Sequence, residues 1–186
     1  MAKKLSDMTL QELWELFPII LTEHQPQWRQ WYEEEAAILK ELLPLCAPYH
    51  IGSTAIPGIW AKPIVDILLE APEGATLQEI KAVLLSGGWI CMSEEPGRLS
   101  FNKGYTPQGF AQRVFHLHLR RQGDTAELLF RDYLLSHPDA ARAYEKLKLS
   151  LWKPYEHDRD GYTAAKTEFV SRITRQAAEE QAGTTS

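Results

Sequence analysis

The sequence predicts a single α/β (α+β) domain in which helices cover one face of a sheet and further helices follow toward the C-terminus. Three observations predict this fold class. Helical spacing of apolar residues dominates up to residue 45 and again after residue 121, whereas alternating apolar and polar runs fill the stretch between them. The length of 186 residues, 44% of them hydrophobic, suits one core. We therefore divide the domain, 1–186, into N-terminal helices (1–45), a sheet core (46–121) and C-terminal helices (122–181).

Two helices are expected before the sheet. Thr9 precedes the run LQELWELF in a capping position. Pro26 heads the longer run QWRQWYEEEAAILKELL, where a proline fits the first turn of a helix. The acidic residues 33–35 form its solvated side, and Pro44 and Pro48 end it.

Short strands and one helix come next. YHIGS is a strand that runs into a glycine turn, and PIVDILLE is the following strand. Thr76 is expected to cap the helix LQEIKAVLLS, which Gly87 and Gly88 end. The apolar run WICM after them is expected to be a buried strand, and it contains Cys91.

Two later strands each have one apolar and one polar face. Successive side chains of a strand point to opposite sides of the sheet, so alternation separates the two sets. We expect helices to cover the apolar side, and the polar side, joined by Asp66, to line an open cleft. The polar residues are Arg98, Ser100 and Asn102 in RLSFN, and His116, His118 and Arg120 in VFHLHLR.

From residue 124 onward the pattern is helical. Three helices are expected, over ELLFRDYLLS, over PDAARAYEKLKLSLW and from about residue 158 to residue 180. The residues Arg131, Asp132, Tyr133, Tyr162 and Lys166 suit helix packing or a helix surface, and Lys166 can alternatively reach a substrate phosphate.

Charge and cysteine usage exclude several classes of protein. A net charge of −5 and a pI near 5.7 argue against general affinity for nucleic acid, because such binding depends on Lys and Arg. Cys46 and Cys91 show no metal-type spacing, so free thiols and a cytoplasmic location are expected. We expect no membrane span, since no run approaches about 20 apolar residues, and no secretory leader, since no apolar segment follows the basic residues of MAKKLSDMTL.

The stretch HIGSTAIPGIWAKPIVDILLE carries the chemistry. Gly52 and Ser53 form a turn whose backbone N–H groups and hydroxyl can approach a polyphosphate closely, and Asp66 lies on the strand that follows. A carboxylate there can hold the divalent ion that neutralises phosphate charge. This pairing is typical of metal-dependent phosphoryl chemistry, although an ordinary strand-ending turn would also explain the Gly-Ser pair.

Gly52 and Ser53, followed by Asp66, resemble the opening signature of the DNA polymerase beta-type nucleotidyltransferase superfamily. The chain resembles, more specifically, the GrpB family within that superfamily, over about residues 24–173. This resemblance implies a nucleotidyltransferase-like fold with a mixed sheet; it implies no defined reaction, because the family as a whole has none well established. The matching segments are HIGSTAIPGIWAKPIVDIL, HLHL, FRDYL, HPDAARAYEKLK and YTAAKTEFVSRI.

Asp66 is the first candidate for catalysis and metal binding, and a structural salt bridge is its other interpretation. The superfamily usually has a second carboxylate two residues later, where this chain has Leu68. His116 and His118 can complete a metal site with Asp66, or one can act as a general base; they can equally be ordinary hydrogen-bonding histidines. The expected cofactor is a divalent ion, Mg or Mn, with Zn as a further candidate, because a nitrogen-rich site favours Mn, Zn or Fe over Mg.

Positive charge for a phosphate is expected from several lysines and arginines. Arg98 and Arg120 are the better candidates because alternation places them with the histidines, and the other candidates are Lys62, Lys103 and Arg113. Any one of these side chains can also be merely solvated. The predicted nucleotide- or phosphate-binding set is Gly52, Ser53, Lys62, Arg98 and Arg120.

Three functions stay open at this stage. The first is an enzyme that transfers a nucleotidyl group to a small acceptor with the help of a metal ion. The second is an inactive module that binds a nucleotide or a coenzyme A-related ligand; the resemblance includes relatives fused to coenzyme A biosynthesis enzymes, and Leu68 favours this alternative. The third is an interaction protein that binds neither ion nor nucleotide.

Overall fold

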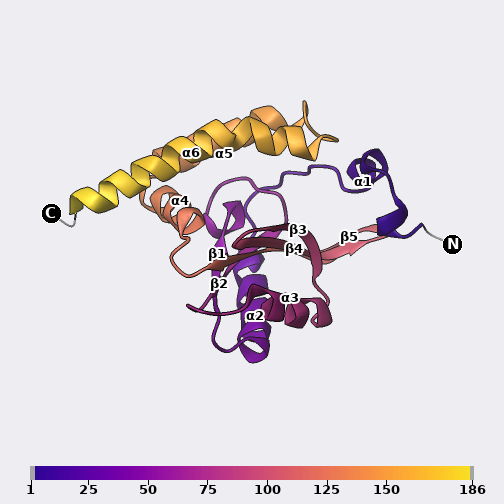
Figure 1. Ribbon diagram of the computed structural model, residues 1–186. Helices are drawn as coiled ribbons and strands as arrows, with labels where there is room; N and C mark the ends of the chain where they lie inside the picture. The colour runs from indigo at the N-terminus through magenta and orange to yellow at the C-terminus, as the bar shows by residue number, and fades with distance from the viewer. Residues whose placement is uncertain (1–2, 185–186) are drawn as a thin grey trace.

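The structure is a computed structural model that describes residues 3–184 (Figure 1). Two single 3₁₀ turns, η1 (Leu5–Asp7) and η2 (Ser53–Ala55), accompany the longer elements. These are α1 (Leu10–Leu16), α2 (Gln27–Leu42), β1 (Ala47–Ile51), β2 (Val65–Ala71), α3 (Leu77–Ser86), β3 (Ile90–Glu95), β4 (Arg98–Thr106), β5 (Gly109–Arg121), α4 (Ala126–Ser136), α5 (Pro138–Trp152) and α6 (Arg159–Thr184).

The five strands form one mixed sheet in the order β1-β2-β5-β4-β3. β2 and β5 pair in parallel, and the other neighbouring pairs are antiparallel. A parallel pair needs a crossover connection, which here consists of α3, β3 and β4. The prediction of an α/β fold with a mixed sheet is confirmed, and the crossover places Asp66 of β2 beside His116 of β5.

Helices α2 and α3 cover one face of this sheet, as predicted (Figure 1). The apolar residues of the alternating strands point into the core beneath these helices because a strand presents every second side chain to one side. The core includes Trp28, Leu39, Val65, Ile67, Leu69, Ile80, Leu84, Leu99, Phe101, Phe115, Leu117 and Leu119.

The C-terminal helices lie on the opposite side of the sheet from α2 and α3 (Figure 1). Arg131 of α4 donates to the backbone oxygen of His50 in β1 (2.9 Å), which fixes α4 against the strand. The polar face is therefore partly covered, whereas the sequence predicted an open cleft. The amphipathic helices cause this difference, because they bury their apolar sides against one another and against the loop before β2. The residues of this second core are Ile56, Ile59, Phe130, Leu134, Ala141, Tyr144 and Ile173.

Several element boundaries differ from the prediction. β4 and β5 are longer than RLSFN and VFHLHLR because a tight hairpin joins them, with Gly104 at φ +91° beside an irregularity in their register. β3 was predicted to be buried, but it is an edge strand on which Ile90 and Met92 are exposed, and its Cys91 is half-buried. Both Cys46 and Cys91 are free thiols, as expected.

Two threonines were predicted to cap helices, and only one of them makes a capping hydrogen bond. Thr9 forms a capping box with Glu12 at the start of α1. Thr76 occupies the predicted capping position of α3, but its side chain makes no capping hydrogen bond.

Within residues 3–184, none of the helices combines the length and the apolar character that crossing a bilayer requires.

Candidate functional site

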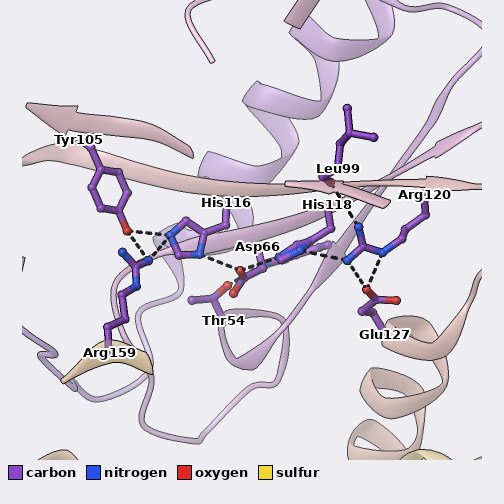
Figure 2. A network of polar contacts seen from close by, with 10 residues as sticks. Thr54, Asp66, Leu99, Tyr105, His116, His118, Arg120, Glu127 and Arg159 are labelled. Carbon is purple, nitrogen blue, oxygen red and sulfur yellow. Dashed lines mark hydrogen bonds and ion pairs between the residues drawn. The ribbon is translucent and has the colours of Figure 1, made fainter. Parts of the chain in front are cut away.

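The candidate site lies on the polar face of β2 and β5, under the C-terminal helices. Asp66 is opposite His116 in the parallel register, and His118 follows two residues later on the same side. Figure 2 shows both imidazole rings converging on the Asp66 carboxylate. The three proposed catalytic side chains are thus brought together, as alternation on two neighbouring strands requires.

One oxygen of Asp66 faces both histidines. Oδ1 lies 3.4 Å from His116 Nδ1 and 3.4 Å from His118 Nε2. The Asp66 side chain is 26% exposed and that of His116 15%, so little water screens the pair. Burial alone raises the pKa of Asp66, but the contacts with His116 and His118 outweigh it and hold the pKa of this carboxyl well below its usual range.

The far side of the His116 ring contacts two residues that the sequence did not single out. His116 Nε2 is 2.7 Å from the Tyr105 hydroxyl and 2.9 Å from an Arg159 nitrogen (Figure 2). Because a guanidinium only donates, we assign Nε2 as the acceptor and place the ring proton on Nδ1, toward Asp66. Burial lowers the pKa of His116 to about 4, despite Asp66, and the ring is neutral at pH 7.

The two arginines predicted to bind phosphate are paired with acids. Arg120 is 6% exposed, and its guanidinium bonds Glu127 of α4 at 2.9 Å. Arg98 makes a two-pronged pair with Asp124 at 2.8 and 2.7 Å. Both side chains come from polar-face positions, but their charge is matched locally, and they tie β4 and β5 to the start of the C-terminal segment.

The Gly52-Ser53 turn lies directly against Asp66. Gly52 has φ +70°, and a Cβ at this position would be 2.5 Å from Asp66 Oδ2. Glycine is therefore required both by the backbone conformation and by the close approach. Ser53 bonds the hydroxyl of Tyr144 in α5, whose pKa burial raises to about 12.

His50 has a structural role next to this turn. Its Nε2 is 2.9 Å from the hydroxyl of buried Thr54, and its ring stacks on Tyr32 with centroids 4.8 Å apart. Burial lowers the pKa of His50 to about 4, so this ring is also neutral at pH 7.

A group of lysines faces the same region from the loop before β2 and from two helices. Lys62 lies over the Tyr162 ring at 5.5 Å and Lys166 over the same ring at 4.3 Å. Lys148 of α5 is 2% exposed and donates to the backbone oxygen of Trp60. We call Lys62, Lys148 and Lys166 the lysine cluster.

Sequence reasoning named Lys62 and Lys166 but missed Lys148, Arg159 and Tyr105. Helical spacing offered a signal, because residues 159, 162 and 166 share one face of α6 and residues 144 and 148 share one face of α5. What the spacing could not show is that both faces point at β2.

The fit of a divalent ion depends on Asp66 and its histidines. Two donors that bind one ion at about 2.0–2.1 Å in a tetrahedral arrangement are about 3.3 Å apart, close to the 3.4 Å between Asp66 and each ring. His118 faces Asp66 through Nε2, which such an ion can use. His116 faces Asp66 through Nδ1, which carries the ring proton because Nε2 accepts from Arg159. Across residues 3–184 there is no group of three His, Cys, Asp or Glu side chains arranged to hold a metal. Asp66 and one imidazole therefore fit an ion that a ligand would help to complete.

Comparisons of sequence place the chain among bacterial relatives. The family model described as "GrpB protein" matches residues 18–176. A UPF0157 protein of Pseudomonas aeruginosa is 42% identical over 158 residues, which cover 82% of this chain and 64% of the relative. A dephospho-CoA kinase of Mycolicibacterium paratuberculosis is 28% identical over 153 residues, covering 69% of this chain and 38% of that enzyme. The chain thus matches less than two thirds of either relative.

Solved structures support the fold. The GrpB protein of Enterococcus faecalis is 32% identical, with a TM-score of 0.75 over 87% of this chain and 99% of that one. A Cid1 poly(U) polymerase bound to MgATP is 11% identical, with a TM-score of 0.50 over 69% of this chain and 42% of that one. At this identity the second likeness concerns the nucleotidyltransferase fold alone.

Proposed function

The chain belongs to the GrpB family, and from that premise we propose that it binds a nucleotide between β2 and the C-terminal helices and transfers the nucleotidyl group to a small acceptor. The proposal joins the nucleotidyltransferase-like fold to the chemistry of the residues around Asp66. A fold alone does not define a reaction, so the proposed reaction must be argued from the residues of the site.

The observation that carries the proposal is the contact between Gly52 and Asp66. In this proposal the backbone N–H groups of the turn and the Ser53 hydroxyl bind a phosphate, next to the place where Gly52 packs against Asp66 Oδ2. A phosphate bound by this turn would have its reacting phosphorus next to the carboxylate, which is the geometry that nucleotidyl transfer needs.

The remaining residues take separate roles in this proposal. The acceptor oxygen forms a bond to the α-phosphorus while the bond to the leaving pyrophosphate breaks, and His118 is placed to take the acceptor proton. His116, neutral and held by Tyr105 and Arg159, positions Asp66. A divalent ion held by Asp66 and by phosphate oxygens of the ligand would neutralise phosphate charge, which leaves His118 to act as the base. The lysine cluster would stabilise the charge of the leaving pyrophosphate.

A second function is favoured by Leu68. It is fully buried on β2, where the superfamily usually has its second carboxylate, so a paired-carboxylate site is incomplete. The chain would then bind a nucleotide or a coenzyme A-related ligand without turnover. The likeness to part of a dephospho-CoA kinase makes that ligand class worth including.

The test combines a thermal-shift screen with an assay for released pyrophosphate. Wild type, Asp66→Ala and the exposed control Asp139→Ala are screened with nucleotides and coenzyme A precursors, each with Mg, Mn or Zn. A ligand at a hundred times its Kd contributes about 2.7 kcal/mol, which is about 5–10 °C for a chain of this size. We expect a metal-dependent shift in wild type and in the control, and its loss in Asp66→Ala.

The outcomes separate the two functions. Pyrophosphate release that depends on Asp66 supports the transferase, and binding without product supports the module. Undiminished turnover in Asp66→Ala would refute the role of that carboxylate. No shift with any nucleotide or precursor would overturn both functions.

A further inference from the structure

The groups behind the His116 ring have the opposite polarity to those behind a histidine that binds a metal ion. A metal-ligating histidine almost always donates its second ring N–H to an acceptor, such as a carboxylate or a carbonyl oxygen. On His116, Nε2 instead lies 2.9 Å from a nitrogen of Arg159 and 2.7 Å from the hydroxyl of Tyr105 (Figure 2). A guanidinium only donates, so Nε2 is an acceptor and the ring proton lies on the side of Asp66.

The hydroxyl of Tyr105 is a second donor to the same nitrogen. It accepts a hydrogen bond from Arg159 at 2.7 Å, so its own proton is free to point at the imidazole. The Tyr105 ring packs on Phe17 and Phe110, with centroids 4.7 and 5.3 Å away, and this packing holds the hydroxyl in place. A proton on Nε2 of His116 would therefore face the donating groups of Arg159.

Arg159 has no carboxylate partner among residues 3–184, whereas Arg98 and Arg120 are each paired with an acid. Its guanidinium contacts His116, the Tyr105 hydroxyl and the face of the Tyr105 ring, 5.4 Å from the centroid. A half-buried charge that no acid neutralises is costly. Hydrogen bonds from a charged donor are about twice as strong as neutral ones, so this arginine holds the proton of His116 firmly in position.

His118 is held less firmly than His116. Its Nδ1 lies 3.5 Å from a nitrogen of Arg120, at the limit of hydrogen-bond distance, and that guanidinium bonds Glu127 at 2.9 Å. A ring without a close donor behind it can change tautomer at little cost. His118 can therefore offer the lone pair of Nε2 to an ion, whereas His116 cannot offer that of Nδ1.

The spacing around Asp66 shows what a released His116 would form. Asp66 Oδ1 lies 3.4 Å from Nδ1 of His116 and 3.4 Å from Nε2 of His118. Both distances are close to the separation of about 3.3 Å between two ligands of one tetrahedral ion. A carboxylate and two imidazoles are a ligand set that suits zinc. The proton on Nδ1 is what keeps His116 out of such a set.

We infer that Arg159, together with Tyr105, withholds His116 from the ion at Asp66 and thereby makes the site select against zinc. This inference rests on the proposed function for the presence of an ion at Asp66. The ligands left to that ion are a carboxylate, at most one imidazole and phosphate oxygens, which suit magnesium or manganese better. Arg159 thus determines metal specificity through His116, without touching the ion.

The experiment measures the zinc affinity of the full chain at neutral pH without nucleotide, by competition with a chromophoric chelator. Arg159→Met should bind zinc about tenfold to a hundredfold more tightly than wild type, the size of effect typical of groups behind a metal-ligating histidine. Arg159→Gln should gain at least as much, because its amide oxygen can accept the imidazole proton. Arg159→Lys keeps a charged donor and should resemble wild type. Arg175→Met, on an exposed position of α6, is the matched control and should change nothing.

A double-variant cycle identifies His116 as the residue that is released. The gain from Arg159→Met should disappear when it is combined with His116→Ala, because no ring is left to be freed. If Arg159 acted only by repelling a cation, the gain would persist in that background. Tyr105→Phe removes the second donor without a change of charge and should give a smaller gain of the same kind. This variant also keeps the test valid if Arg159→Met fails to fold, which circular dichroism would show.

The nitrogen-15 spectrum of the imidazole is a readout that needs no metal. In wild type the proton of the neutral His116 ring should lie on Nδ1 alone. In Arg159→Met the two tautomers should be mixed, and in Arg159→Lys the wild-type spectrum should return. A purely structural role of Arg159 would leave the tautomer unchanged.

Two results would overturn the inference. One is an equal zinc affinity in wild type, Arg159→Met and Arg159→Gln, including no binding by any of them, and the other is a gain that persists without His116. Nucleotide transfer by a protein with unaltered zinc affinity in these variants would sink the inference alone. A gain in zinc affinity that depends on His116, in a chain that binds no nucleotide, would sink the proposed function alone.

Discussion

Ser100 and Phe101 are neighbours on β4, yet they face opposite sides of the sheet. Phe101 is 0% exposed within the core that α2 and α3 cover, whereas Ser100 lies opposite His118 on the polar face. The apolar face is filled by aliphatic and aromatic side chains. The polar face holds a carboxylate and two histidines, and the lysine cluster faces it from the loop before β2 and from α5 and α6.

The apolar face of the sheet contributes most of the stability of the fold, whereas the polar face contains the candidate site. Burial of apolar area stabilises the fold and requires no particular ligand. The polar face instead concentrates groups whose pKa is shifted by burial, which is typical of a functional site. The molecule tolerates the cost of this second face because the first one supplies the hydrophobic driving force.

The largest expected effect is on the apolar face. Phe101→Ala should lower the free energy of unfolding by about 3–5 kcal/mol, because it removes a fully buried ring and leaves a cavity. Ser100→Ala, its neighbour on the other face, should change it by less than about 1 kcal/mol. Urea denaturation of both variants gives the comparison, and similar losses in the two would contradict the assignment of the faces.

A smaller effect is expected from pH on the polar face. The folded pKa of Lys62 and Lys148 is about 7, below the unfolded value near 10.5, so the folded state binds fewer protons between these values. The free energy of unfolding must therefore rise as the pH increases from about 7 toward 10.5. Below about pH 7 these lysines are protonated in both states, and they cause no change of stability with pH. Between pH 7 and pH 9 each of these two lysines should contribute up to about 2 kcal/mol to the stability of the ligand-free protein.

Lys148→Met tests the origin of that gain. The variant should lose part of the increase in melting temperature between pH 7 and pH 9, whereas Lys146→Met on the exposed side of α5 should keep it. A pH dependence that is the same in wild type and in Lys148→Met would show that this lysine is protonated normally in the fold.

The smallest effect is expected at the rim of the polar face. Arg98→Met removes a pair with Asp124 whose arginine side chain is 48% exposed, so the free energy of unfolding should fall by less than about 1 kcal/mol. The thermal shift caused by any ligand should be unchanged, because Arg98 is paired at the end of β4. A loss of that shift would instead place Arg98 in the ligand site.

Much of the fold was predictable from local patterns. Alternation in β4 and β5 predicted which side chains share a face, and helical spacing predicted α5 over its observed range, Pro138–Trp152. β3 was misjudged because an apolar run is equally consistent with a buried strand and with an edge. Only the strand order shows that nothing pairs with its outer side among the described residues.

The candidate site was predictable in part. Asp66, His116 and His118 are together because they occupy matching positions on paired strands. Arg98 and Arg120 are on the predicted face, but Asp124 and Glu127 neutralise them, and no strand pattern indicates such partners. Lys148 and Arg159 come from helices far along the chain from Lys62, so their approach to β2 could not be read from spacing.

The sequence by itself determined the two-faced strands, the turn at Gly52 and the amphipathic helices, because each depends on geometry within a few residues of the chain. The tertiary structure alone decided which charges meet. It pairs Arg98 and Arg120 with acids and leaves Lys62 and Lys166 without them. The physical reason is that the energy of a charge depends on burial and on neighbours in space, and those neighbours come from segments that only the folded chain brings together.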